Sequence, residues 1–164
     1  MTVSAKTRAR ARVITNIAPQ MHSLRSERIL WRRNASSASA PRTTEAPLIY
    51  VVDDMPDLTG LYSTVLEETG YRVRAINDRA EAVAALKADR TKPDLLITDY
   101  LGHAMPIDRF LQECLVVHPA LRILMASGFR QVHVQFSRAR PERFIQKPFT
   151  LAEFRQEIKA ALTA

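Results

Sequence analysis

The chain has very little cysteine: Cys114 is the only one among 164 residues. A single cysteine excludes an intrachain disulfide and a zinc site built from several cysteines, and it is typical of a reducing compartment. We therefore expect a cytoplasmic location. The sequence also has no apolar run that approaches the roughly 20 residues a membrane-spanning helix needs, so we expect no membrane insertion.

An excess of charge is absent from most of the chain. The whole sequence has a net charge of +7, from 24 basic and 17 acidic residues. Residues 1–46 contain nine basic and two acidic residues, so 9 − 2 = +7, and residues 47–164 keep 24 − 9 = 15 basic and 17 − 2 = 15 acidic residues. The basic footprint of a nucleic-acid-binding domain is therefore missing from residues 47–164, and we expect no nucleic-acid partner for that part.

Residues 1–46 differ in composition from the remainder. They begin rich in arginine and alanine, Pro19 interrupts any early helix, and the periodicity over 20–33 is poor for a helix. Residues 35–47 are small and polar, as in linkers. We expect a disordered basic extension over 1–46 and one domain over 47–164. Two alternatives stay open for the extension: an arm that contacts nucleic acid, acidic lipid or a partner protein, and an organelle transit peptide.

Strand-like and helix-like segments alternate from residue 48 onward. Short apolar runs predict strands over 48–52, 71–76, 95–99, 121–127 and 143–146. Helical periodicity and end signals predict helices that begin near Pro56, Asp78, Ile107 and Thr150, with Gly70 ending the first. The segment 128–142 predicts only a short or irregular helix. This order predicts a parallel sheet covered on both faces by helices, with right-handed crossovers.

Polar side chains stand where four of the predicted strands end: Asp53 and Asp54, Asp99, Ser127, and Lys147. Carboxyl ends of parallel strands share one edge of the sheet, which is where such sheets bind ligands. Three clustered carboxylates repel one another, and a hard divalent cation such as Mg²⁺ with oxygen ligands relieves that repulsion. The four histidines are dispersed, and we expect each to be at the surface or hydrogen-bonded.

This set of groups indicates phosphoryl chemistry. An aspartate beside Mg²⁺ and a lysine can attack phosphorus and form an acyl phosphate, while a serine hydroxyl binds one phosphoryl oxygen. The structural alternative is that Lys147 pairs with an aspartate for stability alone.

Four motifs match one known family in order and in approximate spacing. VVDD (51–54), ITDY (97–100), MASG (125–128) and QKPF (146–149) resemble the motifs of the receiver domains of two-component response regulators. The resemblance covers residues 47–164. It implies the flavodoxin-like (CheY-like) fold, a doubly wound parallel sheet of five strands in the order 2-1-3-4-5 with helices on both faces.

The resemblance also implies a role for each matching residue. Asp99 corresponds to the phosphoacceptor, and Lys147 to the lysine that binds the phosphoryl group. Mg²⁺ would be held by Asp53, Asp54, Asp99 and the backbone carbonyl of Leu101. Ser127 and Phe144 correspond to the switch residues, and Pro148 to a proline that follows a cis peptide bond. The loop 101–106 departs from the family pattern because it is longer and lacks a later glycine.

The function implied is that of a stand-alone receiver that signals by protein contact. A sensor histidine kinase or a histidine phosphotransfer protein would supply the phosphoryl group. The only reactions expected are Mg²⁺-dependent self-phosphorylation and slow autodephosphorylation, so we expect no enzyme in the usual sense.

Three points stay open beside this reading. A degenerate receiver would bind partners without phosphorylation. An aspartyl-phosphate hydrolase would carry an acid two residues after its nucleophile, where this chain has Leu101. A homodimer could form through the face made by the segment 128–142, the strand 143–146 and the last helix.

Overall fold

The computed structural model describes residues 45–129, 136 and 139–163. The predictions for residues 1–44, and for 130–135 and 137–138 within the irregular segment, lie outside the described residues. Within the described part, strands and helices alternate along the chain. They are β1 (Leu48–Val52), α2 (Pro56–Glu68), β2 (Arg72–Ile76), α3 (Arg79–Ala88), β3 (Leu95–Asp99), α4 (Ile107–Val117), β4 (Arg122–Ser127), β5 (Arg143–Gln146) and α5 (Leu151–Thr163).

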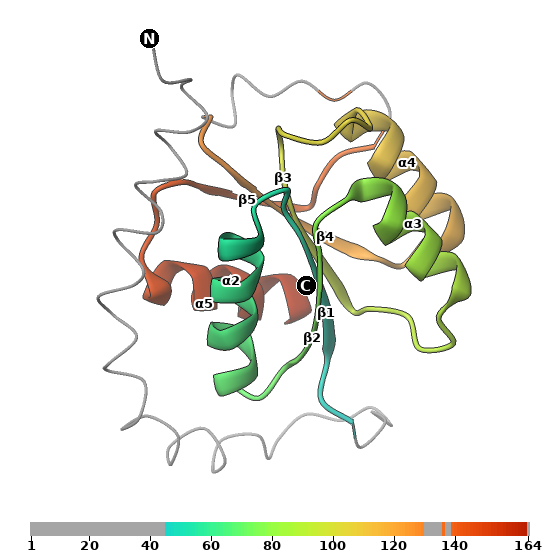
Figure 1. The fold of residues 1–164 in the computed structure, drawn as a ribbon. Coiled ribbons are helices and arrows are strands. Elements are labelled where there is room, and N and C mark those ends of the chain that lie inside the picture. Colours follow the sequence, from blue (N-terminus) through green and yellow to red (C-terminus); the bar gives the residue numbers. More distant parts are fainter. Residues whose placement is uncertain (1–44, 130–135, 137–138, 164) are drawn as a thin grey trace, which may run out of the picture.

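The strands form one parallel sheet in the order β2-β1-β3-β4-β5. Helices α2 and α5 cover one face of this sheet, and α3 and α4 cover the other (Figure 1). The predicted flavodoxin-like architecture with strand order 2-1-3-4-5 is therefore confirmed. None of the helices in the described residues is long and apolar enough to cross a bilayer.

The core consists of two apolar layers, one on each face of the sheet. Successive side chains of a strand point to opposite faces. Ile49 and Val51 accordingly join the layer under α2 and α5, whereas Tyr50 and Val52 join the layer under α3 and α4. All five residues of β3 are buried. Burying each large apolar side chain contributes about 1.5–3 kcal/mol, so the central strand is firmly held in place.

Local signals in the sequence account for the ends of several helices. Pro56 occupies the first turn of α2, and Gly70 follows the helix with a φ of 94°, in the left-handed region that favours glycine. The Asp78 side chain accepts a hydrogen bond from the Glu81 amide at the start of α3. Thr150 and Glu153 cap α5 reciprocally, as predicted.

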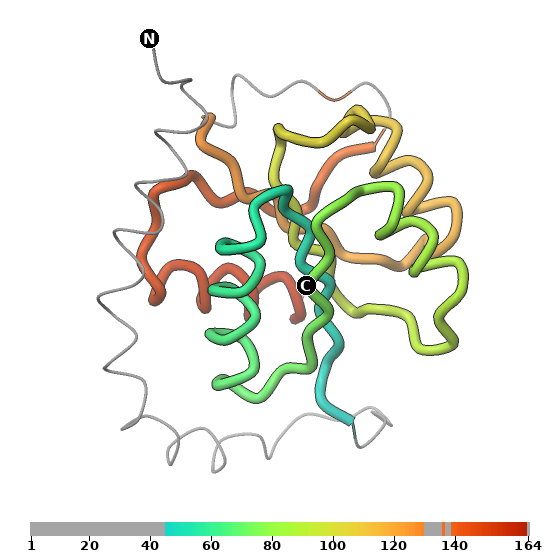
Figure 2. Tube along the Cα trace, in the orientation of Figure 1, coloured from blue at the N-terminus to red at the C-terminus, as the bar shows by residue number. Residues whose placement is uncertain are grey.

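The connections after the strands bring their carboxyl ends to one edge of the sheet. Figure 2 shows the chain turning at the upper edge after β1, β2 and β3. Strand β2 lies at the lateral end of the sheet, as its alternating pattern predicted, and begins at Arg72 rather than at residue 71. Cys114 is buried in the layer under α3 and α4, as expected for a small core residue.

Candidate functional site

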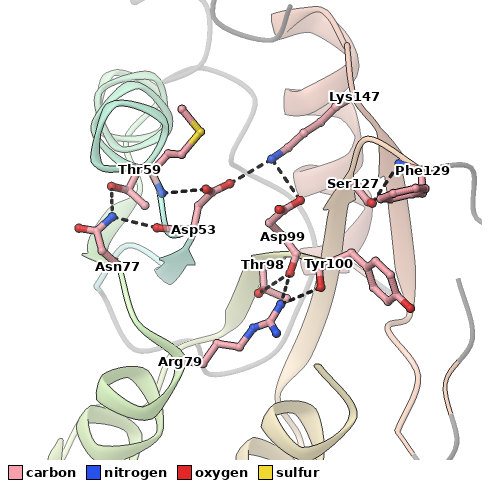
Figure 3. A network of polar contacts seen from close by, with 11 residues as sticks. Asp53, Thr59, Asn77, Arg79, Thr98, Asp99, Tyr100, Ser127, Phe129 and Lys147 are labelled. Carbon is pink, nitrogen blue, oxygen red and sulfur yellow. Dashed lines mark hydrogen bonds and ion pairs between the residues drawn. The ribbon is translucent and has the colours of Figure 1, made fainter. Parts of the chain in front are cut away.

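The four polar strand ends meet at the carboxyl edge of the sheet. Asp53 follows β1, Asp99 is the last residue of β3, Ser127 is the last residue of β4, and Lys147 follows β5. All four are buried. Figure 3 shows Lys147 reaching between Asp53 and Asp99, and Ser127 ends the strand next to the one that carries Asp99. The structure thus brings together the groups that the sequence placed at the strand ends.

Lys147 connects two of the carboxylates. Its Nζ lies 3.0 Å from Oδ2 of Asp53 and 3.4 Å from Oδ1 of Asp99. The same ammonium is 5.9 Å from the centroid of the Tyr62 ring, within reach of a cation–π attraction. The Lys147 amide donates to the carbonyl oxygen of Ser127 at 2.7 Å, which ties the start of the loop between β5 and α5 to β4. Only 2% of Lys147 is exposed, so its positive charge is buried beside these carboxylates.

The three aspartates form an oxygen-rich cluster. One carboxylate oxygen from each of Asp53, Asp54 and Asp99 lies within 4.8 Å of the other two. Asp53 is oriented further by the amide of Met55, which donates to its Oδ1 at 3.1 Å. Three carboxylates against the Lys147 ammonium leave an excess of negative charge, and hard oxygen donors suit Mg²⁺. These residues therefore fit a divalent cation in both charge and donor type.

Neutral contacts hold the strand end that carries Asp53. The side-chain amide of Asn77 donates to the Asp53 carbonyl oxygen at 2.9 Å and to Oγ1 of Thr59 at 3.0 Å. Thr59 is buried on α2. Helix α2 and the connection after β2 are thereby linked to the backbone of the acidic cluster.

The two predicted switch residues lie on neighbouring strands. The Ser127 hydroxyl accepts a hydrogen bond from the Phe129 amide at 3.1 Å. Phe144 on β5 is partly buried and packs against the layer under α3 and α4. Tyr100 makes edge contacts with the rings of Phe129 and Phe136, each at 6.2 Å between centroids. The switching role of Ser127 and Phe144 stays a prediction.

Two further predictions for the site concern the backbone rather than side chains. The peptide bond between Lys147 and Pro148 is cis, as the resemblance implied. Leu101 lies two residues after Asp99 in the loop that leads to α4. The role of its carbonyl as a metal ligand stays a prediction.

Arg79 belongs to this region and was not predicted from the sequence. It is the first residue of α3, and only 2% of it is exposed. Its guanidinium donates to the carbonyl oxygens of Asp99 and Tyr100 (Figure 3) and, at 2.8 Å, to that of Met105. A cation in the first turn of a helix opposes the helix dipole. This unfavourable position of a cation was the one signal in the sequence that the Arg79 side chain makes other contacts.

His103 departs from the expectation stated for the histidines. Its ring is half-buried, and within the described residues its Nε2 is buried and has no hydrogen-bond partner. Burial, followed by the charge of Arg79, lowers the pKa of His103 to about 4, although the charges of Asp54, Asp99 and Asp78 act in the opposite direction. The ring is therefore neutral at pH 7. The position of His103 could not be predicted because the loop 101–106 has neither helical nor strand periodicity.

Fold and site together define a flavodoxin-like α/β domain with an acidic cluster at the carboxyl edge of its sheet. A family model described as the response regulator receiver domain matches residues 49–159. The chain therefore belongs to the response regulator receiver domain family. Receiver domains are signalling modules of two-component systems rather than enzymes.

One curated protein is similar to the chain in sequence, and solved structures share its fold. The chain is 31% identical over 105 residues to the nitrogen assimilation regulatory protein NtrX of Azorhizobium caulinodans, which covers 62% of this chain and 23% of that protein. A CheY-like receiver domain protein from Methanospirillum hungatei has a TM-score of 0.64 at 20% identity, covering 73% of this chain and 95% of that chain. Response regulator TrrA from Thermotoga maritima, solved in complex with Mg²⁺ and BeF, has a TM-score of 0.63 at 22% identity, covering 71% and 99%. The chain thus spans about a quarter of the length of NtrX.

Proposed function

We propose that this receiver accepts a phosphoryl group on Asp99, with Mg²⁺ held by Asp53, Asp54 and Asp99 and by the backbone carbonyl of Leu101. The donor is the phosphohistidine of a sensor histidine kinase or of a histidine phosphotransfer protein. The observation that supports this most strongly is the buried Lys147 ammonium, 3.0 Å from Asp53 and 3.4 Å from Asp99, beside three carboxylate oxygens gathered within 4.8 Å.

The transfer of the phosphoryl group is a single displacement at phosphorus. A carboxylate oxygen of Asp99 forms a bond to phosphorus while the phosphorus–nitrogen bond of the donor breaks, and the electron pair of that bond stays on the imidazole nitrogen. The Lys147 ammonium neutralises negative charge on the phosphoryl oxygens. Asp53, Asp54 and Asp99 would hold a Mg²⁺ ion, which would supply further neutralisation of the phosphoryl charge. The chain's own residues thus provide the nucleophile, the metal ligands and the anion-binding cation.

Asp99 is preferred over Asp53 as the nucleophile because of how each carboxylate is held. Both oxygens of Asp53 make contacts, one with the Met55 amide at 3.1 Å and one with Lys147 at 3.0 Å. This pattern suits a residue that orients a cation and the lysine. Oδ1 of Asp99 lies farther from the Lys147 ammonium, at 3.4 Å. Asp99 ends β3, the central strand of the sheet, between β1 and β4.

The response to phosphorylation is a local rearrangement. The Ser127 hydroxyl accepts a hydrogen bond from the Phe129 amide and keeps its own proton to donate to a phosphoryl oxygen. Movement of Ser127 towards Asp99 would let Phe144 follow inward from its partly buried position. The signal would then leave by protein contact in the cytoplasm, as the sequence predicts.

Labelling with acetyl phosphate and Mg²⁺ tests the proposal. We expect the wild type to be labelled, the label to depend on Mg²⁺, and the variant Asp99→Asn to remain unlabelled. Asp57→Asn is the matched control, because Asp57 is exposed in the first turn of α2 and should not affect labelling. Labelling that survives in Asp99→Asn contradicts the assignment. A wild type that takes no label and binds no Mg²⁺ would instead support the degenerate receiver.

A further inference from the structure

The long loop after Asp99 is tied down by one buried side chain from a different element. Arg79, at the start of α3, donates from Nη2 to the carbonyl oxygens of Asp99 at 2.6 Å and Tyr100 at 3.1 Å. Its Nη1 donates to the carbonyl oxygen of Met105 at 2.8 Å. A single guanidinium therefore holds the beginning of the loop and, five residues later, its end.

These bonds act on the backbone that presents the candidate ligands. The carbonyl of Asp99 belongs to the peptide unit beside the acceptor carboxylate, and the carbonyl of Tyr100 belongs to the unit just before Leu101. Holding these two carbonyls restricts the dihedral angles of Tyr100, which lies between the two peptide planes, and the bond to Met105 holds the far end of the loop that contains Leu101. Gly102 follows with a φ of 107°, where the chain turns back towards Met105.

The guanidinium is enclosed, and its position costs free energy. Only 2% of Arg79 is exposed, and its Cζ lies 5.6 Å from the centroid of the Phe110 ring. A buried charge is tolerated only with good hydrogen bonds, and arginine stays charged at every relevant pH. The planar fork presents donors on two separate nitrogens in a fixed geometry, whereas the three donors of a lysine ammonium diverge from one nitrogen on a flexible stem.

We propose that Arg79 is a positioning residue of the acceptor site. It clamps the loop 100–106 so that the carboxylate of Asp99 and the carbonyl of Leu101 are preset for a divalent cation. The Arg79 guanidinium lies over Phe110 on one face of the sheet, whereas the Lys147 ammonium lies over Tyr62 on the other. This inference rests on the proposed function and adds to it a residue that the four family motifs do not include.

Three variants separate positioning from charge and from general stability. Arg79→Gln removes the charge and the fork, and Arg79→Lys keeps the charge without the fork. Arg122→Gln is the matched control, because the Nη1 atom of Arg122 also donates to a backbone carbonyl, that of Leu162 at 2.8 Å, but from the start of β4 at the opposite edge of the sheet. Each full-length protein is measured by Mg²⁺ calorimetry, by acetyl phosphate labelling at saturating Mg²⁺, and by hydrogen exchange of the amides in 100–106.

We expect Arg79→Gln to bind Mg²⁺ about 10–100-fold more weakly, the usual effect of losing a residue that orients metal ligands. Arg79→Lys should remain about tenfold weaker, and both variants should exchange the 100–106 amides faster than the wild type. Arg122→Gln should unfold at a lower urea concentration while its Mg²⁺ affinity, labelling rate and loop exchange stay at wild-type values.

Several outcomes would overturn the inference. Wild-type Mg²⁺ affinity in Arg79→Lys would show that the forked contacts are unnecessary, and this variant decides the matter even where Arg79→Gln does not fold. Unchanged exchange of the 100–106 amides in Arg79→Lys would show that no clamp exists. Labelling of Asp99→Asn would refute the proposed function separately, because the exchange measurement does not depend on which carboxylate is phosphorylated.

Discussion

Replacing Lys147 with methionine removes the positive charge that lies between the side-chain carboxylates of Asp53 and Asp99. The side chains of Lys147, Asp53 and Asp99 are 1%, 3% and 6% exposed, so the two carboxylates stay buried after the change. Breaking a buried ion pair from one side typically costs about 3–5 kcal/mol, because the remaining charge is uncompensated. We expect Lys147→Met to lose about that much free energy of unfolding at pH 7 without Mg²⁺.

Urea unfolding in the presence of a chelator measures this loss. With a usual dependence of about 1–3 kcal/mol per molar urea, the midpoint should fall by at least about 1 M. Lys87→Met is the matched control: the ammonium of Lys87 lies 3.8 Å from Glu113 in a pair whose lysine is 59% exposed. Such a surface pair contributes about 0–1 kcal/mol, so the control should unfold close to the wild type.

Addition of Mg²⁺ gives the same experiment a second readout. A ligand at 100 times its dissociation constant stabilises the folded state by about 2.7 kcal/mol. In Lys147→Met the cation replaces a missing positive charge, so a fixed Mg²⁺ concentration should stabilise this variant more than the wild type. A variant as stable as Lys87→Met in the chelator, or one that gains nothing from Mg²⁺, would refute the electrostatic reasoning.

Two further predictions concern Ser127 and Cys114. Ser127→Ala should keep its Mg²⁺ affinity and lose about 1 kcal/mol of stability, because the Phe129 amide loses its acceptor. Acetyl phosphate should label this variant up to about 100-fold more slowly than the wild type. Unchanged labelling would show that Ser127 takes no part in the reaction. Burial, and then the charge of Glu113, raises the pKa of the Cys114 thiol from 9.0 to about 12. The native protein should therefore not react with a thiol reagent at pH 8, whereas the unfolded chain should. Because the folded state keeps the proton longer than the unfolded state does, this group contributes stability below pH 9 that is lost as the pH rises towards 12, which thermal unfolding at a series of pH values measures.

The acidic cluster could be predicted from the sequence because the position of its residues follows from local patterns. Each of β1, β3 and β4 is a short apolar run, and a parallel sheet places the residue that follows such a run at one common edge. Asp53, Asp99 and Ser127 were therefore assigned to the same place without any knowledge of long-range contacts. Lys147 followed from the same reasoning applied to β5.

Arg79 and His103 could not be found in this way. Their surroundings depend on the path of the loop 101–106, which has neither helical nor strand periodicity. Arg79 also stands where a surface residue is expected, at the start of an amphipathic helix, and its contacts reach residues 20 to 26 positions away. Only the folded loop brings those carbonyl groups to the guanidinium.

Chemical mapping of the phosphorylated residue tests the central claim most directly. Borohydride reduces an acyl phosphate to an alcohol, so a phosphorylated aspartate becomes homoserine. After reaction with acetyl phosphate and Mg²⁺, reduction and peptide mapping should find homoserine at position 99, and Asp99→Asn should yield none. Homoserine at position 53 or 54 instead, or homoserine formed in Asp99→Asn, would contradict the account.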